Sequence, residues 1–133
     1  LEQLDDEGFK VIVIITGHYG GLHVRGLKEV AEWYQQKHPH LRVWALPEFE
    51  VVTDLGYTGD HAAKWETSIF WHLHPDLTDI SRYRTDLTMR EQGVVGENPS
   101  EHASPELGEM IVNAIAERVA ARCAELLAEV EDS

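Results

Sequence analysis

The sequence has one cysteine, no surplus of positive charge and no long hydrophobic run. The single Cys123 excludes an internal disulfide and is compatible with a reducing compartment. Eleven lysine and arginine residues stand against 24 aspartate and glutamate residues, which gives a formal net charge of −13. Such a chain is a poor match for nucleic acid or an anionic lipid surface. No apolar run approaches the roughly 20 residues of a membrane span. We therefore expect a cytoplasmic protein that binds neither nucleic acid nor membrane.

The length and the first residues bear on domain organisation. The chain has 133 residues, 43% of them hydrophobic, which is enough for one modest core. It opens on LEQLDDEG, without an initiator methionine, and this pattern predicts the last turns of an amphipathic helix that stops at Gly8. A natural domain rarely opens on the tail of a helix. We therefore expect residues 1–133 to be the C-terminal part of a single domain, with the N-terminal part supplied upstream or by a companion chain.

Three segments predict a strand, a helix and a second strand. Residues 10–16 (KVIVIIT) are β-branched and almost wholly apolar, which is typical of a strand buried on both faces of a parallel sheet. Apolar residues recur at helical spacing over residues 22–37, and residues 41–46 (LRVWAL) predict the second strand. This order indicates a parallel α/β unit with a right-handed crossover.

The second half of the chain predicts helices joined by long loops. Residues 47–59 predict a loop with one short helical turn, residues 60–74 a helix that ends before Pro75, and residues 81–102 an extended loop. The sequence Ser-Pro-Glu at residues 104–106 is a strong helix start, with a hydroxyl cap, a proline in the first position and an acid in the first turn. An apolar stripe at helical spacing follows, so we expect a long final helix.

His18 directly follows the first predicted strand, in a glycine-rich turn at residues 17–21. Ligands of open α/β sheets gather beyond the carboxyl ends of the strands, so His18 is a candidate metal ligand. Taken alone, the Gly-His pair fits a polar turn with a capping or solvated histidine at least as well. The dinucleotide-binding pattern GxGxxG is absent, although backbone amides at such a turn could bind a phosphorylated small molecule.

Asp60, His61 and Glu66 form a second cluster at the start of the helix predicted for residues 60–74. On one straight helix, His61 and Glu66 would point about 140° apart. Both could face one ion if His61 lies on the loop leading in and Glu66 in the first turns. Imidazole nitrogen and carboxylate oxygen suit zinc, manganese or iron. Taken alone, these residues fit capping and dipole interactions at the helix end better than a metal site.

Taken together, the two clusters resemble the creatininase family of metal-dependent amidohydrolases. The sequence GHYGG after an apolar strand is similar to the family's Gly-His-Gly-Gly-Asn or Gly-His-Tyr-Glu-Asn motif. Later family motifs are matched by DHA at residues 60–62, ETS at 66–68, PDL at 75–77, GVVG at 93–96 and ASPELG at 103–108. The resemblance covers nearly the whole chain. It implies a three-layer α/β/α fold with a mainly parallel sheet, of which the N-terminal part is missing.

The resemblance also implies an activity and a set of roles. Family members hold two divalent metal ions, zinc or manganese with iron as a further option, that activate water and polarise an amide carbonyl. By position, His18 and Glu66 match metal ligands, His61 matches a residue placed for proton transfer, and Asp60 matches the acid that orients it. The implied reaction is hydrolysis of the C–N bond of an amide, cyclic amide or formamide in a small molecule.

Substrate contacts and assembly are implied in the same way. Tyr19 and Gly20 match residues that face the substrate, and Tyr57 matches an aromatic residue on the flap of creatininase. Family members are homo-oligomers, commonly hexamers, so the resemblance implies a homo-oligomer here.

This sequence departs from the family's pattern in the first motif and beside the second. Thr16 replaces an asparagine, Gly20 stands where creatininase itself has a metal-binding glutamate, and Gly21 replaces another asparagine. Ala63 replaces a glycine, and Lys64 adds a positive charge. These changes argue against creatininase activity in the narrow sense. They leave a catalytically lapsed binding or structural subunit of the same family as the alternative function.

The family's remaining ligands, a Glu-x-His motif and a following aspartate, have no counterpart in this chain. His23 is not an obvious replacement, because five residues after His18 on a helix it would project about 140° away. A dinuclear site made only of His18 and Glu66 would be under-coordinated. We therefore expect the complete dinuclear site to need residues from outside this chain.

Overall fold

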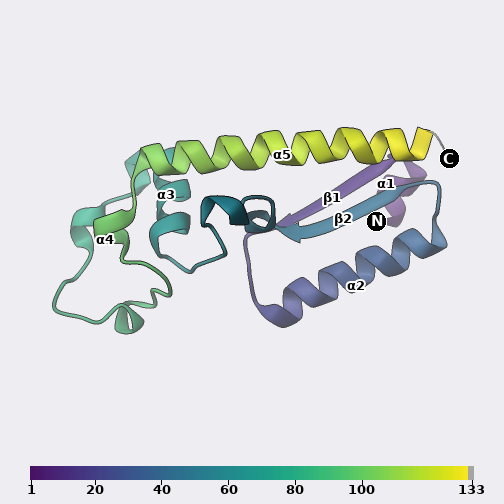
Figure 1. Ribbon diagram of the computed structural model, residues 1–133. Coiled ribbons are helices and arrows are strands. Elements are labelled where there is room, and N and C mark those ends of the chain that lie inside the picture. Colours follow the sequence, from purple (N-terminus) through teal and green to yellow (C-terminus); the bar gives the residue numbers. More distant parts are fainter. Residues whose placement is uncertain (132–133) are drawn as a thin grey trace. The chain divides into compact units, whose positions relative to one another are not determined.

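The computed structural model describes residues 1–131 and divides the chain into two compact units. The first unit comprises Leu1–Val51 together with the chain from Glu117 onward, and the second comprises Val52–Ala116. Helices predominate in the described residues, and their one sheet has two strands (Figure 1). The predicted α/β class with a parallel sheet is confirmed at this level.

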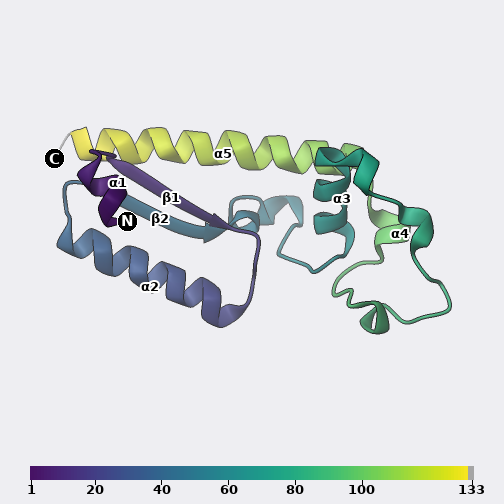
Figure 2. The same ribbon diagram turned by 180° about the vertical axis from the view of Figure 1, so that it is seen from behind.

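The sheet of the first unit pairs β1 (Val11–Thr16) with β2 (Arg42–Pro47) in parallel. The connecting helix α2 (Gly21–Lys37) runs along the sheet, as the two opposite views show (Figures 1 and 2). The strand–helix–strand order predicted from the sequence is therefore confirmed. Because both strands end in the same direction, their carboxyl ends bring the loops after Thr16 and Pro47 to one edge of the sheet.

The core of the first unit joins β1, β2 and α2. Ile12, Tyr34 and Leu41 are buried, and Ile14 and Val43 pack against them. Burial of side chains of this size contributes roughly 1.5–3 kcal/mol each. These contacts explain why an apolar, β-branched run forms a strand here.

Ile15 of β1 does not follow the prediction that both faces of this strand are buried. Ile15 is 48% exposed, so β1 is not covered on both faces by the described residues. The expectation of a strand buried on both faces is wrong for this part of the chain.

The N-terminal helix α1 (Glu2–Asp6) and its stop at Gly8 are also as predicted. Gly8 has a φ of +88°, in the left-handed region where glycine carries no Cβ penalty. Asp5 anchors α1, because its carboxylate accepts a hydrogen bond from the Tyr34 hydroxyl. The hydrogen bond with His40 lowers the pKa of the Asp5 carboxyl, so this group is ionised at neutral pH.

The chain after β2 forms short helices and two longer ones. In chain order, these are η1 (Glu48–Val51), η2 (Thr53–Leu55), α3 (Lys64–Leu73), η3 (Pro75–Leu77), η4 (Ile80–Arg82), η5 (Arg90–Gln92), α4 (Pro99–His102) and α5 (Pro105–Glu131). The loop predicted for residues 47–59 has two helical turns instead of one. The helix predicted from residue 60 begins at Lys64 instead, for reasons that lie in the candidate site.

The start of α5 is the one that the sequence predicts. The Ser104 hydroxyl accepts a hydrogen bond from the Leu107 amide at 3.1 Å, which satisfies one of the free N–H groups of the first turn. Gly108 then passes close to α3, where a Cβ on this residue would lie 2.0 Å from the Ser68 carbonyl oxygen. Glycine at this position therefore lets the two helices of the second unit approach closely.

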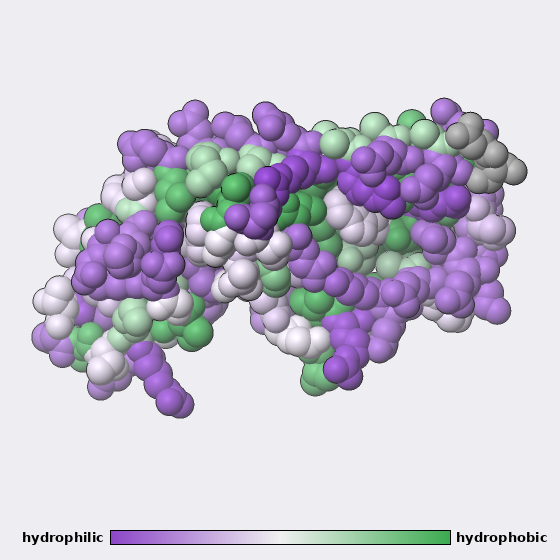
Figure 3. Space-filling model, in the orientation of Figure 1, coloured by the Kyte–Doolittle hydropathy of each residue, from purple (hydrophilic) through white to green (hydrophobic). Residues whose placement is uncertain are grey.

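The exposed surface agrees with the composition. The face in Figure 3 is mainly hydrophilic, as expected for a chain with a net charge of −13. Among residues 1–131, no helix has both the length and the apolar character that crossing a membrane requires.

Candidate functional site

His18 lies where the sequence predicts, two residues beyond the end of β1. The Thr16 hydroxyl holds this loop, because its Oγ1 accepts a hydrogen bond from the His18 amide at 3.1 Å. The His18 residue is exposed, and its ring folds over Gly20. A Cβ on Gly20 would lie 2.7 Å from His18 Nε2, so the ring occupies the space that a side chain at position 20 would need.

His23 lies beside His18, which corrects the expectation that it would project away. The centroids of the two rings are 5.2 Å apart in an edge-to-face arrangement. Helix α2 begins only at Gly21, so His18 is outside the helix and the rotation argument for two residues on one helix does not apply. His23 Nε2 also lies 3.0 Å from Thr16 Oγ1. The helix predicted for residues 22–37 also leaves His18 outside, so the rotation argument did not hold for the predicted helix either.

The absence of a side chain at position 20 is therefore expected to control the orientation of His18. We predict that Gly20→Ala displaces the His18 ring, because the imidazole is the movable partner of a 2.7 Å overlap. The free energy of unfolding should change by less than about 1 kcal/mol, since only the end of a side chain must shift. The measurement is the NMR resonances of the His18 ring, together with the thermal midpoint. Gly17→Ala, where an added Cβ meets nothing within 4 Å, is the matched control. Unchanged His18 resonances in Gly20→Ala would contradict the prediction.

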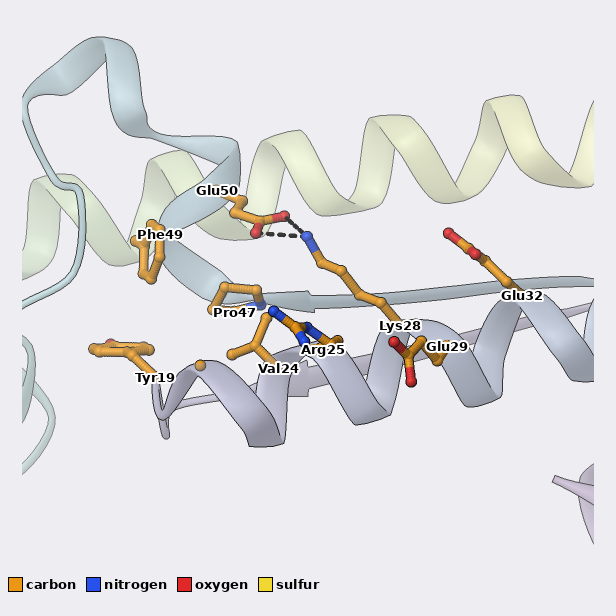
Figure 4. A pocket seen from close by; sticks show the side chains of 10 residues that line it. Tyr19, Val24, Arg25, Lys28, Glu29, Glu32, Pro47, Phe49 and Glu50 are labelled. Carbon is orange, nitrogen blue, oxygen red and sulfur yellow. Dashed lines mark hydrogen bonds and ion pairs between the residues drawn. The ribbon is translucent and has the colours of Figure 1, made fainter.

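A surface pocket of about 470 Å³ adjoins this loop in the first unit. Its lining residues are Tyr19, Gly21, Val24, Arg25, Lys28, Glu29, Glu32, Pro47, Phe49 and Glu50. Figure 4 shows Tyr19 at one end of the pocket, near Phe49, with Lys28 reaching from α2 toward Glu50. Of the three predicted substrate-binding residues, Tyr19 is the one that lines this pocket.

Polar contacts fix this pocket wall. The Tyr19 hydroxyl donates a hydrogen bond to Glu48 Oε1, and its ring packs edge-on against Phe49 with centroids 5.0 Å apart. The Lys28 ammonium lies 2.7 Å from Glu50 Oε1. Tyr19 thus joins the loop before α2 to η1, and Lys28 joins α2 itself to η1.

Asp60 acts as a cap for α3 from four residues before the helix. Its carboxylate accepts hydrogen bonds from the amides of Trp65 at 2.7 Å and Glu66 at 3.1 Å, two N–H groups with no partner inside the helix. Burial raises the pKa of the Asp60 carboxyl, while these two N–H donors act in the opposite direction. The described contacts of Asp60 are thus with the backbone of α3, and its predicted role in orienting His61 stays a prediction.

His61 lies on the loop before α3, and Glu66 lies in the first turn of that helix. This is the arrangement in which both side chains can face one point: His61 Nδ1 is 3.6 Å from Glu66 Oε2. The His61 side chain is 72% exposed and that of Glu66 is 27% exposed. Both groups are therefore accessible to a small molecule or an ion.

The backbone around His61 explains why α3 starts late. His61 forms an isolated antiparallel bridge with Val95, through two backbone hydrogen bonds of 2.8 and 2.9 Å. Ala62 has a φ of +49°, which is uncommon for a residue with a Cβ, and its amide donates to Glu66 Oε2 at 2.7 Å. A helix cannot pass through residues in these conformations. Such local strain is often found at functional sites, and here it occurs between His61 and Glu66.

Two further residues of this region have partners in the second unit. Tyr57 is fully buried and its ring stacks on that of Trp65 with centroids 5.2 Å apart. Its predicted contact with a substrate stays a prediction. The Lys64 ammonium lies 3.1 Å from Glu97 Oε1 and 4.7 Å from the centre of the Trp65 ring, so its charge is balanced locally.

The donor groups at both clusters suit a divalent transition metal. The exposed imidazole of His18 with that of His23 beside it, and the His61–Glu66 pair, offer nitrogen and oxygen ligands of the kind that zinc and manganese take. These residues therefore fit the group that the sequence resemblance implies.

Comparison with known proteins identifies related sequences and structures. The family model described as creatininase (creatinine amidohydrolase) matches residues 1–123. A crystal structure from Bacteroides fragilis NCTC 9343, whose protein carries the provisional name creatinine amidohydrolase, matches with a TM-score of 0.68 at 25% sequence identity. The match covers 94% of this chain and 57% of that chain, so this chain spans little more than half of its solved relative. No curated protein shows significant similarity.

Proposed function

Because this chain belongs to the creatininase family, we propose that the protein is a metal-dependent hydrolase of a C–N bond in a small molecule. The bond is that of an amide, a cyclic amide or a formamide. The observation that carries the proposal is the His61–Glu66 pair at the start of α3, with 3.6 Å between Nδ1 and Oε2 at positions that match the family's motifs. An exposed imidazole beside a carboxylate is a suitable arrangement for proton transfer.

We propose His18 and Glu66 as metal ligands, for zinc or manganese with iron as a further option, in a site that is dinuclear when complete. Divalent ions in such a site supply water activation and polarisation of a carbonyl group. The edge-to-face contact with His23 supports one orientation of the His18 ring, and Gly20 leaves room for that ring. The Ala62 amide fixes one oxygen of Glu66 and so limits the rotation of its carboxylate.

His61 is proposed to transfer a proton to the leaving nitrogen. Its exposure gives its ring access to a substrate, and its backbone is fixed by the bridge with Val95. Asp60 supports this position because it holds the loop against the first turn of α3. In this proposal Asp60 is a positioning residue, which acts through the backbone that carries His61.

Substrate contacts are proposed for Tyr19 and Gly20, whereas the full burial of Tyr57 against Trp65 does not favour the contact that the resemblance implies for it. The place of Tyr19 in the pocket wall supports its part of the proposal. Creatinine is the substrate in the name of the solved relative. Because Gly20 replaces the metal-binding glutamate of creatininase, we propose that this protein prefers a different amide.

For the whole protein, we propose a single domain of three α/β/α layers, of which residues 1–133 are the C-terminal part, in a cytoplasmic homo-oligomer such as a hexamer. The exposure of Ile15 on β1 supports an additional layer that packs on this face of the sheet in the whole protein. Leu22, Val30 and Trp33 of α2 are 84%, 55% and 59% exposed, which supports a subunit contact on this helix. A monomeric mass in light scattering would contradict the oligomer.

The test of the proposed reaction is a panel of small amides that includes creatinine, other cyclic amides and formamides, with release of the amine or ammonia as the readout. We expect turnover of at least one compound by the complete protein, which includes the residues proposed to lie outside this chain. In His18→Ala, kcat/KM should fall by about 100-fold or more, because a metal ligand is lost. Equal turnover in His18→Ala would contradict the proposed site, and a folded protein that hydrolyses none of the compounds would contradict the proposed reaction.

A further inference from the structure

A second group of potential metal ligands lies in the first unit, on α1 and in the loop between α2 and β2. His38 Nδ1 is 2.8 Å from Asp5 Oδ2, and His40 Nε2 is 2.6 Å from Asp5 Oδ1. One ligand atom from each of the three residues lies within 4.8 Å of the other two. His38 and His40, which follow Asp5 in the sequence by 33 and 35 positions, thus both contact its carboxylate. This cluster is separate from the residues proposed for catalysis.

The cluster is supported by its neighbours and is open to solvent. The Tyr34 hydroxyl donates to Asp5 Oδ2 at 3.1 Å, and the Tyr34 ring stacks on His38 with 4.1 Å between centroids and 3° between planes. These contacts fix Asp5 and His38 in place. The side chains of Asp5, His38 and His40 are 12%, 34% and 51% exposed, so an ion can reach them from solvent.

The chemistry of the three groups suits zinc more than other common ions. Two imidazoles and one carboxylate form a three-ligand set that zinc takes with a fourth position left for water. Magnesium and calcium prefer oxygen ligands, so two nitrogens argue against them. In a tetrahedral zinc site, neighbouring ligand atoms lie about 3.3 Å apart. The observed 2.6 Å between His40 Nε2 and Asp5 Oδ1 would therefore open by well under 1 Å, and His38 Nδ1 lies 2.8 Å from the other oxygen of the same carboxylate.

We propose that Asp5, His38 and His40 form a zinc-binding site that fastens α1 to the start of β2. Asp5 Oδ1 is the oxygen ligand, and Oδ2 keeps the hydrogen bond from Tyr34. One zinc ion would lie among Asp5 Oδ1, His38 Nδ1 and His40 Nε2, and these two nitrogens would carry no hydrogen when they bind it. A neutral imidazole then carries its hydrogen on the other ring nitrogen, and an imidazolium releases one proton. A zinc ion at this point links α1 to the segment before β2, two elements that are far apart in the sequence.

The local charge favours this assignment. Helix α1 has the sequence EQLDD, so Glu2 and Asp6 add negative charge close to Asp5. In a chain with a net charge of −13, a divalent cation at this point reduces repulsion among the acidic groups.

The test is a calorimetric titration of the metal-free protein with zinc chloride. Cobalt(II) serves in a parallel titration as a spectroscopic probe of tetrahedral ligation. We expect His38→Gln and His40→Gln each to weaken zinc binding about 100-fold, because glutamine is a poor zinc ligand but can still donate a hydrogen bond to Asp5. Zinc at about 100 times its Kd should raise the Tm of the unmodified protein by roughly 10 °C and leave that of the double variant unchanged.

The controls separate this site from the proposed catalytic one. His102→Gln and His18→Ala should retain the zinc-dependent rise in Tm, because neither residue belongs to the cluster. Tyr34→Phe keeps the stacked ring and removes only the hydrogen bond to Asp5, so it should weaken zinc binding by roughly 10-fold. The proposal is overturned if the folded protein binds no zinc, if both glutamine variants bind it as tightly as the unmodified protein, or if only His18→Ala abolishes the rise.

Discussion

Replacing Gly108 by alanine is expected to lower the free energy of unfolding by at least about 3 kcal/mol. The new Cβ would lie 2.0 Å from the Ser68 carbonyl oxygen and 2.7 Å from the His72 Cβ. The first contact is with backbone, which cannot move aside as a side-chain tip can. Helices α3 and α5 must therefore separate. The Ser68 hydroxyl, which accepts a hydrogen bond from the Ser104 amide at 3.1 Å, should lose that contact.

Chemical denaturation of Gly108→Ala and of a matched helical variant, Gly26→Ala, measures this effect. Gly26 lies inside α2, where an added Cβ meets nothing within 4 Å. Alanine there should stabilise the protein by about 0.5–1 kcal/mol, because glycine is the poorer helix former. A change of less than about 1 kcal/mol in Gly108→Ala would show that the close approach of α3 and α5 is not required.

His61→Gln is expected to lower kcat by about 100- to 10,000-fold on any amide that the protein hydrolyses. Glutamine can form hydrogen bonds but cannot exchange a proton near neutral pH. Metal content and KM should change little, because His61 is proposed to act on the leaving nitrogen and not as a metal ligand. The measurement is steady-state kinetics across a range of pH, in parallel with metal analysis.

A histidine outside the proposed machinery serves as the control for this variant. His102 belongs to α4, and His102→Gln should retain full kcat. If His61→Gln also retained it, proton transfer would have to be assigned to another group. If His61→Gln instead lost its metal, His61 would be a ligand.

Local signals were enough to predict most of the elements. The apolar run of residues 10–16 forms β1, the hydroxyl of Ser104 caps α5, and Gly8 ends the N-terminal helix. Each of these features depends on residues that are close in the sequence, so a local sequence pattern can predict it. The resemblance to creatininases rested on such short motifs as well, and the match of the family model over residues 1–123 confirms it.

Contacts between distant residues were harder to predict. The start of α3 is set by the bridge between His61 and Val95, which no pattern in residues 60–74 reports. The edge-to-face contact of His18 and His23 depends on where α2 begins, and a shift of the helix start would have separated the rings. Likewise, Asp5 lies beside His38 and His40 in the segment between α2 and β2, a contact between residues that are distant in the sequence.

The central proposal is that His18 and Glu66 are each metal ligands and that hydrolysis requires the metal. The most direct measurement is amide hydrolysis and metal content in the His38→Gln/His40→Gln background, which removes the second proposed site. We expect the protein to purify with metal, to lose activity when a chelator removes that metal, and to regain activity with zinc or manganese. Adding His18→Ala or Glu66→Ala to this background should prevent both binding and recovery. A folded, metal-free protein, or activity that survives metal removal, would contradict the account.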